Sequence, residues 1–322
     1  MASFMDLPTE LRQIIIQHTL QGHRKSPPTP SKSNGILVED FSPVAQRWQL
    51  GSCSVYYERQ DQHCPTNCLP LLLTSRQIST ETKSVLDYMK IDYDLDISVL
   101  NDVDLFPTWI SVPCLTQRIN HLRAEVRLFG HVISSATARC HSGDGGHLGI
   151  DFAFHQVLQR FLMYGPVGEK KGQSNDGFEN KSISVRVLEL NFTSAEKEYP
   201  YPPDHIHWRD FLSQRRGHGK LDREVKIVNG VERSIIVPPK YKTRPQWMAR
   251  WVGNWIDAIL GRDSYGKMYG KMIYENVGTL RFLADGTLIK EFDLSDCSED
   301  VVARREELGF PLLKPEPLPK QP

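Results

Sequence analysis

Between residues 122 and 283 the sequence alternates between strand-like and helix-like segments, and this alternation is the strongest constraint on the fold. The strand-like segments are 122–128, 183–192 and 279–283, and the helix-like segments are 151–164 and 245–260. Strands that alternate with helices form sheets with parallel pairs, because a helix carries the chain from the end of one strand to the start of the next. Hairpin turns at Asn229-Gly230 and Asp285-Gly286 add antiparallel edges. We therefore predict an α+β or mixed α/β fold, with covering helices on a mixed sheet.

The strand at 183–192 has an unusual apolar pattern. Its first apolar residues occupy one phase of the two-residue repeat and its last ones occupy the other, the full set being Ile183, Val185, Val187, Leu188, Leu190 and Phe192. A phase change of this kind predicts either a bulge or a strand that is buried on both faces.

A short amphipathic helix is predicted at residues 7–20. Asp6 can serve as its N-cap, and Pro8 suits a first turn because that position needs no backbone N–H. Apolar and half-polar side chains recur at three- and four-residue steps and form one stripe, made of Leu7, Leu11, Ile14, Ile15 and His18. This stripe either packs on its own domain or is offered to a partner.

The remaining segments can be assigned relative to this helix and to the alternating strands and helices. Residues 22–35 are rich in Pro, Ser and basic side chains, which predicts a disordered insert. A second helix is expected at 70–89, with Leu72, Leu73, Ile78, Val85, Leu86 and Met89 as its buried candidates. We thus divide the chain into a helical element at 1–90, a body at 91–312 and a disordered Pro-rich tail at 313–322.

The composition excludes several classes of partner. The 322 residues contain 39 Lys plus Arg and 39 Asp plus Glu, so the chain has no net charge with which to attract nucleic acid. No window approaches the roughly 20 apolar residues that span a bilayer, and no signal peptide is visible. We expect an intracellular protein, cytoplasmic or nuclear, whose six scattered cysteines are reduced thiols.

Two parts of the sequence together resemble a known module. Leu7, Pro8, Glu10, Leu11 and Ile14 form a Leu-Pro-x-Glu-Leu helix start, and Leu73, Arg76, Gln77 and Ile78 belong to a later Arg-x-hydrophobic helix. The pair resembles the F-box-like module of the large family of fungal F-box proteins. The resemblance implies that Leu7, Pro8, Glu10, Leu11, Ile14 and Ile15 contact the Skp-type adaptor of a ubiquitin ligase, while the rest of the chain selects a client protein.

Three sets of residues are candidate metal or phosphate sites. Cys53, His63, Cys64 and Cys68 are thiol and imidazole groups that could converge on zinc, but their spacing fits no standard zinc module. His205 and His207 could share one side of an extended segment, but a helix start is the preferred explanation for them. The Gly-rich segment 142–146 lacks the Lys-Ser/Thr of a phosphate loop. We therefore predict no metal and no cofactor.

Two further features are candidate recognition surfaces. Trp247, Trp251 and Trp255 recur at four-residue steps and could form an exposed stripe, since Trp is enriched in binding hot spots; burial against the sheet is the alternative. Arg215 and Arg216, with His218 and Lys220 nearby, form a basic patch that could steer an acidic partner or simply lie in a solvated loop.

No nucleophile elbow, triad order or kinase signature is visible in the sequence. We therefore expect a non-enzymatic interaction protein, an F-box-like adaptor that joins a Skp-type protein to a client. The alternatives are an α/β enzyme with a site of dispersed residues and a scaffold with no link to ubiquitin.

Overall fold

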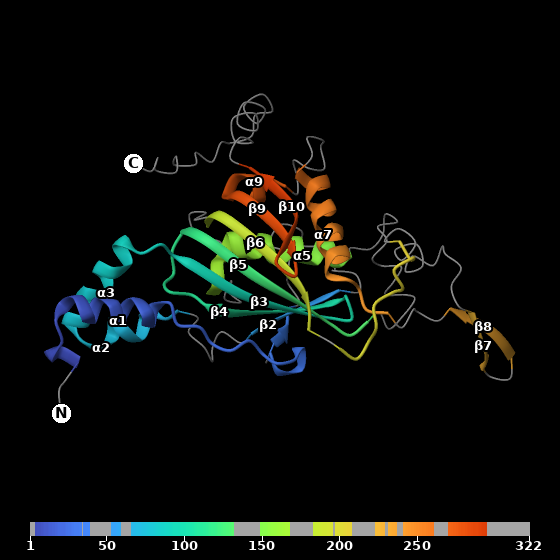
Figure 1. Ribbon diagram of the computed structural model, residues 1–322, viewed down its shortest axis with the longest axis horizontal. Coiled ribbons are helices and arrows are strands. Elements are labelled where there is room, and N and C mark those ends of the chain that lie inside the picture. The colour runs from blue at the N-terminus through green and yellow to red at the C-terminus, as the bar shows by residue number, and fades with distance from the viewer. Residues whose placement is uncertain are drawn as a thin grey trace, which may run out of the picture.

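The chain is described here from a computed structural model, and it is built on one large mixed sheet (Figure 1). The structure describes residues 4–33, 35–38, 53–58, 66–131, 149–167, 183–195, 197–207, 223–228, 231–236, 241–260 and 270–294. The predicted tail at 313–322 lies outside these ranges. Among the residues within them, no helix has the length and apolar character needed to cross a membrane.

The sheet has eight strands in the order β1-β2-β4-β3-β5-β6-β9-β10. The strands are β1 (Gly35–Leu37), β2 (Ser54–Glu58), β3 (Asp92–Leu100), β4 (Asp104–Ser111), β5 (Arg118–Phe129), β6 (Ser184–Ser194), β9 (Val277–Ala284) and β10 (Thr287–Asp293). The pairs β3–β5, β5–β6 and β6–β9 are parallel, and β9–β10 is an antiparallel edge hairpin. The predicted mixed sheet is therefore confirmed.

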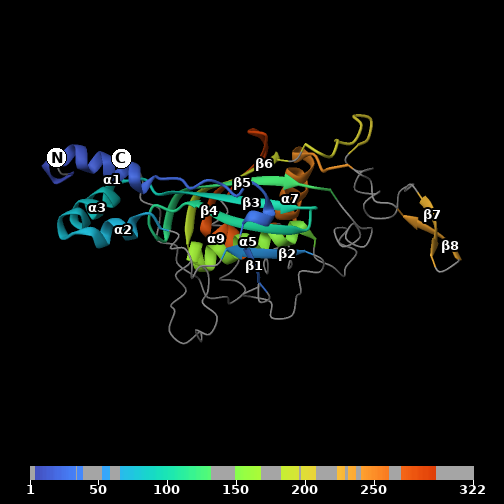
Figure 2. The same ribbon diagram turned by 90° about the horizontal axis from the view of Figure 1, so that it is seen from below.

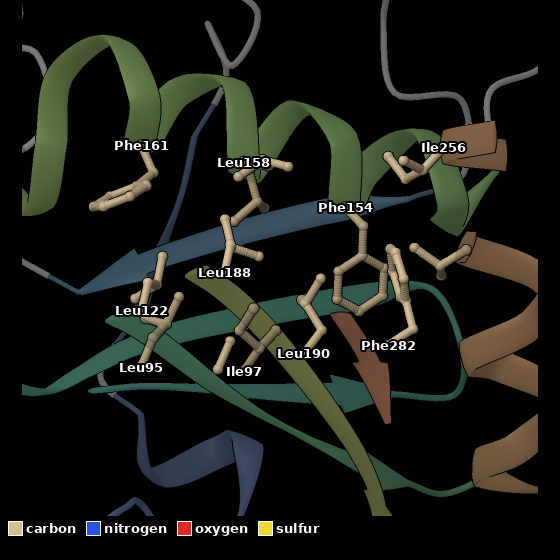
Figure 3. A pocket seen from close by; sticks show the side chains of 13 residues that line it. Leu95, Ile97, Leu122, Phe154, Leu158, Phe161, Leu188, Leu190, Ile256 and Phe282 are labelled. Carbon is tan, nitrogen blue, oxygen red and sulfur yellow. The ribbon is translucent and has the colours of Figure 1, made fainter. Parts of the chain in front are cut away.

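Two helices cover one face of this sheet, as the alternating sequence pattern predicted. Helix α5 (Ile150–Tyr164) follows β5, and helix α7 (Pro245–Leu260) precedes the short helix α9 (Lys271–Asn276) and β9. Side chains of α5 point toward the sheet (Figure 3). They pack there on apolar residues of several strands, and the contacting set includes Phe154, Leu158, Phe161, Leu95, Ile97, Leu122, Leu188, Leu190 and Phe282.

The predicted phase change in β6 is real, and β5 and β9 share it. The residues buried on the helix side are three positions apart in each strand: Ile119 and Leu122, Val185 and Leu188, and Val277 and Leu280. The pairing register between the three strands is the same before and after this three-residue interval. The alternation of buried and exposed side chains therefore shifts in all three strands at the same level, at Asn120, Arg186 and Gly278. A Cβ atom on Gly278 would lie 2.8 Å from the Arg186 carbonyl oxygen, so the close approach there requires glycine.

The opposite face of the sheet carries charged side chains. At one register level, five neighbouring strands carry side chains of alternating sign, namely Asp94, Arg123, Glu189, Arg281 and Glu291. Arg123 Nε lies 2.7 Å from Asp94 Oδ1, and Arg281 Nε lies 2.6 Å from Glu291 Oε2. Opposite charges on neighbouring strands stabilise the pairing of these strands.

The structure differs from the prediction of a disordered insert at 22–35. Residues 22–33, called the strap below, run from the end of α1 along the sheet (Figures 1 and 2). The Arg24 N–H donates to the Ile110 carbonyl oxygen over 3.0 Å, and Arg127 Nη2 donates to the Pro27 carbonyl oxygen over 2.6 Å. Pro30 and Ser33 are buried. A polar composition without a period hides this order, because the strap is held by charges on strands far away in sequence.

Two other expectations differ from the structure, and one strand was not predicted. The helix expected at 70–89 breaks at Ser75 into α2 (Cys68–Thr74) and α3 (Arg76–Tyr88), because Ser75 is extended and caps α3 by accepting from the Ile78 N–H. The strand β4 was missed because it contains Pro107, which lies beyond the short β2–β4 pairing and so removes no ladder bond there. The hairpin around Asn229-Gly230 exists as β7 (Arg223–Val228) and β8 (Val231–Ile236), but it forms a separate two-stranded sheet.

The contact between α5 and α7 holds a carboxyl group with an altered pKa. Burial is the main cause that raises the pKa of Asp151 from 3.8 to about 6, although hydrogen bonds from the Phe152 N–H and Trp251 oppose the shift. The folded state therefore binds this proton more tightly than the unfolded state does. The free energy of unfolding that depends on Asp151 is then largest below about pH 4 and decreases as the pH rises through about 6.

We expect Asp151→Asn to remove this pH dependence, because the amide keeps the shape and cannot ionise. The variant should exceed the wild type in unfolding free energy at pH 8 by up to about 3 kcal/mol and match it at pH 4. Urea unfolding at the two pH values measures the difference. Parallel stability curves for variant and wild type between pH 4 and 8 would contradict the assignment.

Candidate functional site

The candidate site is the N-terminal unit formed by α1 (Thr9–Leu20), α2 and α3, which lies at one end of the sheet (Figure 1). The three helices have an apolar cluster of their own, separate from the core of the body. Its buried members are Ile16, Leu20, Cys68 and Val85, and its partly buried ones are Leu71, Leu72, Leu86, Met89 and Cys114. The two helical segments that the sequence placed on either side of the strap therefore pack together.

A buried ion pair holds α1 against α3. Arg12 Nη2 lies 2.6 Å from Glu81 Oε1, and Arg12 Nε donates to Glu81 Oε2 over 3.0 Å, so the contact is bidentate. Both side chains are about nine-tenths buried. Arg12 also donates to Thr9 Oγ1 over 3.1 Å and to the Leu7 carbonyl oxygen, and Gln77 Nε2 donates to Glu81. Both charged side chains thus have further hydrogen-bond partners, as buried charges require.

This contact decides which face of α1 is buried. Arg12, Ile16 and Leu20 follow one another at four-residue steps and form the face toward α3. The predicted stripe lies on the other side: Leu11 is 48% exposed, Ile14 50% and Ile15 42%. Pro8, Glu10 and His18 are exposed as well, and Leu7 is half-buried. Of the two alternatives left open by the sequence, the structure places this stripe in solvent.

The helix α2 adds further exposed apolar side chains to the same unit. Leu69 is 41% exposed and Leu73 76%, although Leu73 was expected to be buried. The break at Ser75 explains the difference, because it ends the helical phase on which the expectation depended. Isolated exposed leucines are common on protein surfaces, so Leu69 and Leu73 by themselves do not identify a binding surface.

A short segment at Asn67 and Cys68 helps to fasten the helical unit to the sheet. Asn67 Nδ2 donates to the Leu20 and Gly22 carbonyl oxygens over 2.7 and 2.8 Å, at the end of α1. The backbone N–H groups of Asn67 and Cys68 donate to the Val112 and Pro113 carbonyl oxygens, just after β4. The exposed stripe is therefore presented on a unit with a defined position relative to the body.

The tryptophan row of α7 is not an exposed recognition stripe. Trp251 is 8% exposed and belongs to the main core, and Trp255 packs edge-on against Phe152 with ring centroids 6.1 Å apart. Trp247 is half-buried, with the Arg244 guanidinium 5.5 Å from its ring centroid. The alternative of burial holds, because α7 uses this side to cover the sheet. Arg215 and Arg216 lie outside the described residues.

The residues considered for a metal do not come together where the structure describes them. Cys53 is buried in the core of the body and Cys68 in the helical unit, while His63 and Cys64 lie outside the described ranges. His205 and His207 are exposed. Within the described part of the chain, no group of three His, Cys, Asp or Glu side chains could hold a metal ion. The segment 142–146 also lies outside it.

A small cavity of about 30 Å³ lies between the sheet and the helices α5 and α7 (Figure 3). All of its lining residues are apolar, and they include Ala124, Val157, Val252 and Ile256. A cavity of this kind offers no acid, base, nucleophile or metal ligand, so it suggests no reaction.

Comparison with models of protein families, with curated proteins and with solved structures gives no match for this chain.

The sequence could not reveal the Arg12–Glu81 pair. The two residues are 69 positions apart, and Arg12 interrupts the apolar pattern on the face that is in fact buried. The local pattern that could have indicated this buried face is the four-residue spacing of Arg12, Ile16 and Leu20. It is hard to recognise because its first residue is charged.

We expect Glu81→Gln to loosen α1 from α3, because the uncharged amide leaves the buried guanidinium of Arg12 without its counter-charge. Hydrogen exchange of the α1 amides should become faster, while the amides of β5 should keep their protection. Asp87→Asn is the matched control, since Asp87 is an exposed acid on the same helix.

Acid should have the same effect on the wild type. Hydrogen bonding from Arg12 is the largest cause that holds the pKa of Glu81 below its ordinary value. The Glu81 carboxylate therefore makes its full contribution to the free energy of unfolding when the pH is above the ordinary pKa of glutamate. This contribution is lost as the pH falls through the lowered pKa of the folded state. Equal exchange of α1 in the wild type and in Glu81→Gln at pH 7 would contradict the role of this pair.

Proposed function

We propose that the chain is a non-enzymatic interaction protein whose N-terminal unit binds a Skp-type adaptor, as the resemblance to F-box-like proteins implies, while the body takes a client protein. The observation that supports this proposal is the exposure of Leu11, Ile14 and Ile15 on a helix whose other face is anchored. An anchored helix with an exposed aliphatic stripe can be buried by a partner without first unfolding.

The size of the stripe sets what else the partner must contact. Fully burying an aliphatic side chain is worth roughly 1.5 to 3 kcal/mol, and these three are already about half buried, so the stripe supplies about 3 kcal/mol. A micromolar complex needs about 8 kcal/mol after the entropic cost of association. The adaptor must therefore also contact other groups, and Leu69 and Leu73 on α2 are exposed apolar groups of the same unit.

The test is the double variant Leu11→Asp plus Ile15→Asp, with affinity for a purified Skp-type adaptor measured by titration calorimetry. We expect the affinity to fall by at least about 100-fold, because two apolar contacts are lost and two carboxylates must be desolvated. The melting temperature of the body should stay nearly unchanged, since the stripe belongs to neither apolar cluster.

Leu288→Asp is the matched control. Leu288 is 53% exposed on β10, so its substitution places one such carboxylate at a similar exposure, where the double variant places two, and it leaves the helical unit intact. If folded wild-type protein does not bind the adaptor at micromolar concentration, the proposal fails and the function is that of a scaffold without a ubiquitin link. If the double variant unfolds, the stripe belongs to the fold and not to an interface.

A further inference from the structure

The strap (residues 22–33) is a cationic segment that lies on an acidic strand. It contains Arg24, Lys25 and Lys32, together with His23, and it has no acidic residue. The strand β3 beneath it carries Asp92, Asp94 and Asp96, with Glu58 on β2 nearby in the same network. Such complementarity holds a segment in place even though it offers few apolar groups.

The contacts of the strap are mostly polar. His23 Nε2 lies 2.7 Å from Asp94 Oδ2, and Arg24 Nη1 donates to Glu58 Oε1 over 2.9 Å. Arg127 connects strap and strand, because its Nη2 donates both to the Pro27 carbonyl oxygen and, over 2.8 Å, to Asp96 Oδ2. Any change in the charge of the strap therefore acts directly on its attachment.

Thr29 lies at the exposed part of this strap. Its backbone is extended, with φ −144° and ψ 158°, and its hydroxyl group is 3.0 Å from the Ser31 hydroxyl group. The next residue, Pro30, is buried and begins the short 3-10 turn η2 (Pro30–Lys32), whereas Lys32 is exposed. The acceptor hydroxyl is thus accessible, but the residues that follow it are seated on the protein.

The sequence around Thr29 has the pattern Thr-Pro-x-Lys. Proline-directed kinases take a hydroxyl residue followed by proline, and one class of them also selects a cation at the third position after the acceptor. The chain has three Ser/Thr-Pro dipeptides, at Ser26, Thr29 and Ser42, and only Thr29 has Lys or Arg at that third position. Ser26 lies in the same strap and is also followed by proline, but its third following residue is Thr29 and not a cation.

We propose that Thr29 is a phosphorylation site for a proline-directed kinase that selects a cation at the third position, and that the phosphate loosens the strap from β3. In the transfer, Thr29 Oγ1 forms a bond to the γ-phosphorus of ATP, the bond from that phosphorus to the ADP oxygen breaks, and the hydroxyl proton passes to the base of the kinase. A phosphate adds a charge of about −1.5 to −2. The strap's three Lys and Arg charges are then reduced to a net charge of about +1, so its attraction to the acidic strand β3 weakens, and the phosphate itself is repelled by that strand.

The buried position of Pro30 couples the modification to strap release. A kinase that binds Thr29, Pro30 and Lys32 in an extended form must lift Pro30 from the protein and unwind η2. Modification should therefore be faster when the strap is already loose. Arg24→Ala creates that condition, because it removes the contact to Glu58 and leaves the acceptor sequence intact.

The experiment treats the full chain with a purified cyclin-dependent kinase and Mg-ATP and locates the phosphate by peptide mass spectrometry. We expect one phosphate on Thr29, faster in Arg24→Ala, retained in Ser26→Ala, reduced in Lys32→Ala and absent from Thr29→Ala. Phosphate on Ser26 in place of Thr29, or no phosphate in both the wild type and Arg24→Ala, would overturn the site.

Release of the strap is measured separately by hydrogen exchange of the Arg24 amide, which donates to the Ile110 carbonyl oxygen. We expect severalfold faster exchange in the phosphorylated chain, and also in the unmodified chain at 1 M salt, where charges are screened beyond about 3 Å. A phosphorylated Thr29 with unchanged exchange at Arg24 would overturn the claim that the phosphate loosens the strap. Neither readout depends on adaptor binding by the α1 stripe.

Discussion

The structure depends on a sheet whose two faces are stabilised by different interactions. The helices α5 and α7 give one face an apolar cover, so Leu95, Leu122 and Leu188 can be buried together there. The other face carries alternating charges from Asp94 to Glu291. Because this face is charged, the polar strap can lie on it and be held in place by hydrogen bonds and ion pairs.

The same division between apolar and charged contacts explains the helical unit. A wholly apolar contact between α1 and α3 would have used the leucine and isoleucine side chains of α1. The Arg12–Glu81 pair instead supplies part of that contact, and it leaves Leu11, Ile14 and Ile15 in solvent. A buried ion pair gives little net stability compared with apolar residues of the same shape, but it specifies orientation. In this chain the orientation fixes which side of α1 a partner can reach.

The sequence predicted those parts of the fold whose cause is local. The helix at 245–260 and the hairpin at Asp285-Gly286 were found because periodicity and turn chemistry act over a few residues; Asp285 and Gly286 do adopt positive φ angles. The order of the strap, the buried face of α1 and the strand β4 were missed. The strap and the buried face of α1 depend on partners far away in sequence, Glu58 for Arg24 and Glu81 for Arg12. Strand β4 pairs with the strand just before it, but Pro107 concealed it. For the candidate site, the sequence found the stripe but could not decide its exposure.

The strap connects the helical unit to the charged face of the sheet, because it begins where α1 ends. Asn67 holds the carbonyl groups of Leu20 and Gly22, and the charged contacts of the strap begin immediately afterwards at His23 and Arg24. The helical unit has its own apolar cluster and its own ion pair, and no residue of the strap belongs to either of them. Loosening the strap would therefore uncover Asp94 and Asp96 on the sheet while leaving the α1 stripe in place. A charge change in the strap can thus alter the body's surface separately from the surface offered by α1.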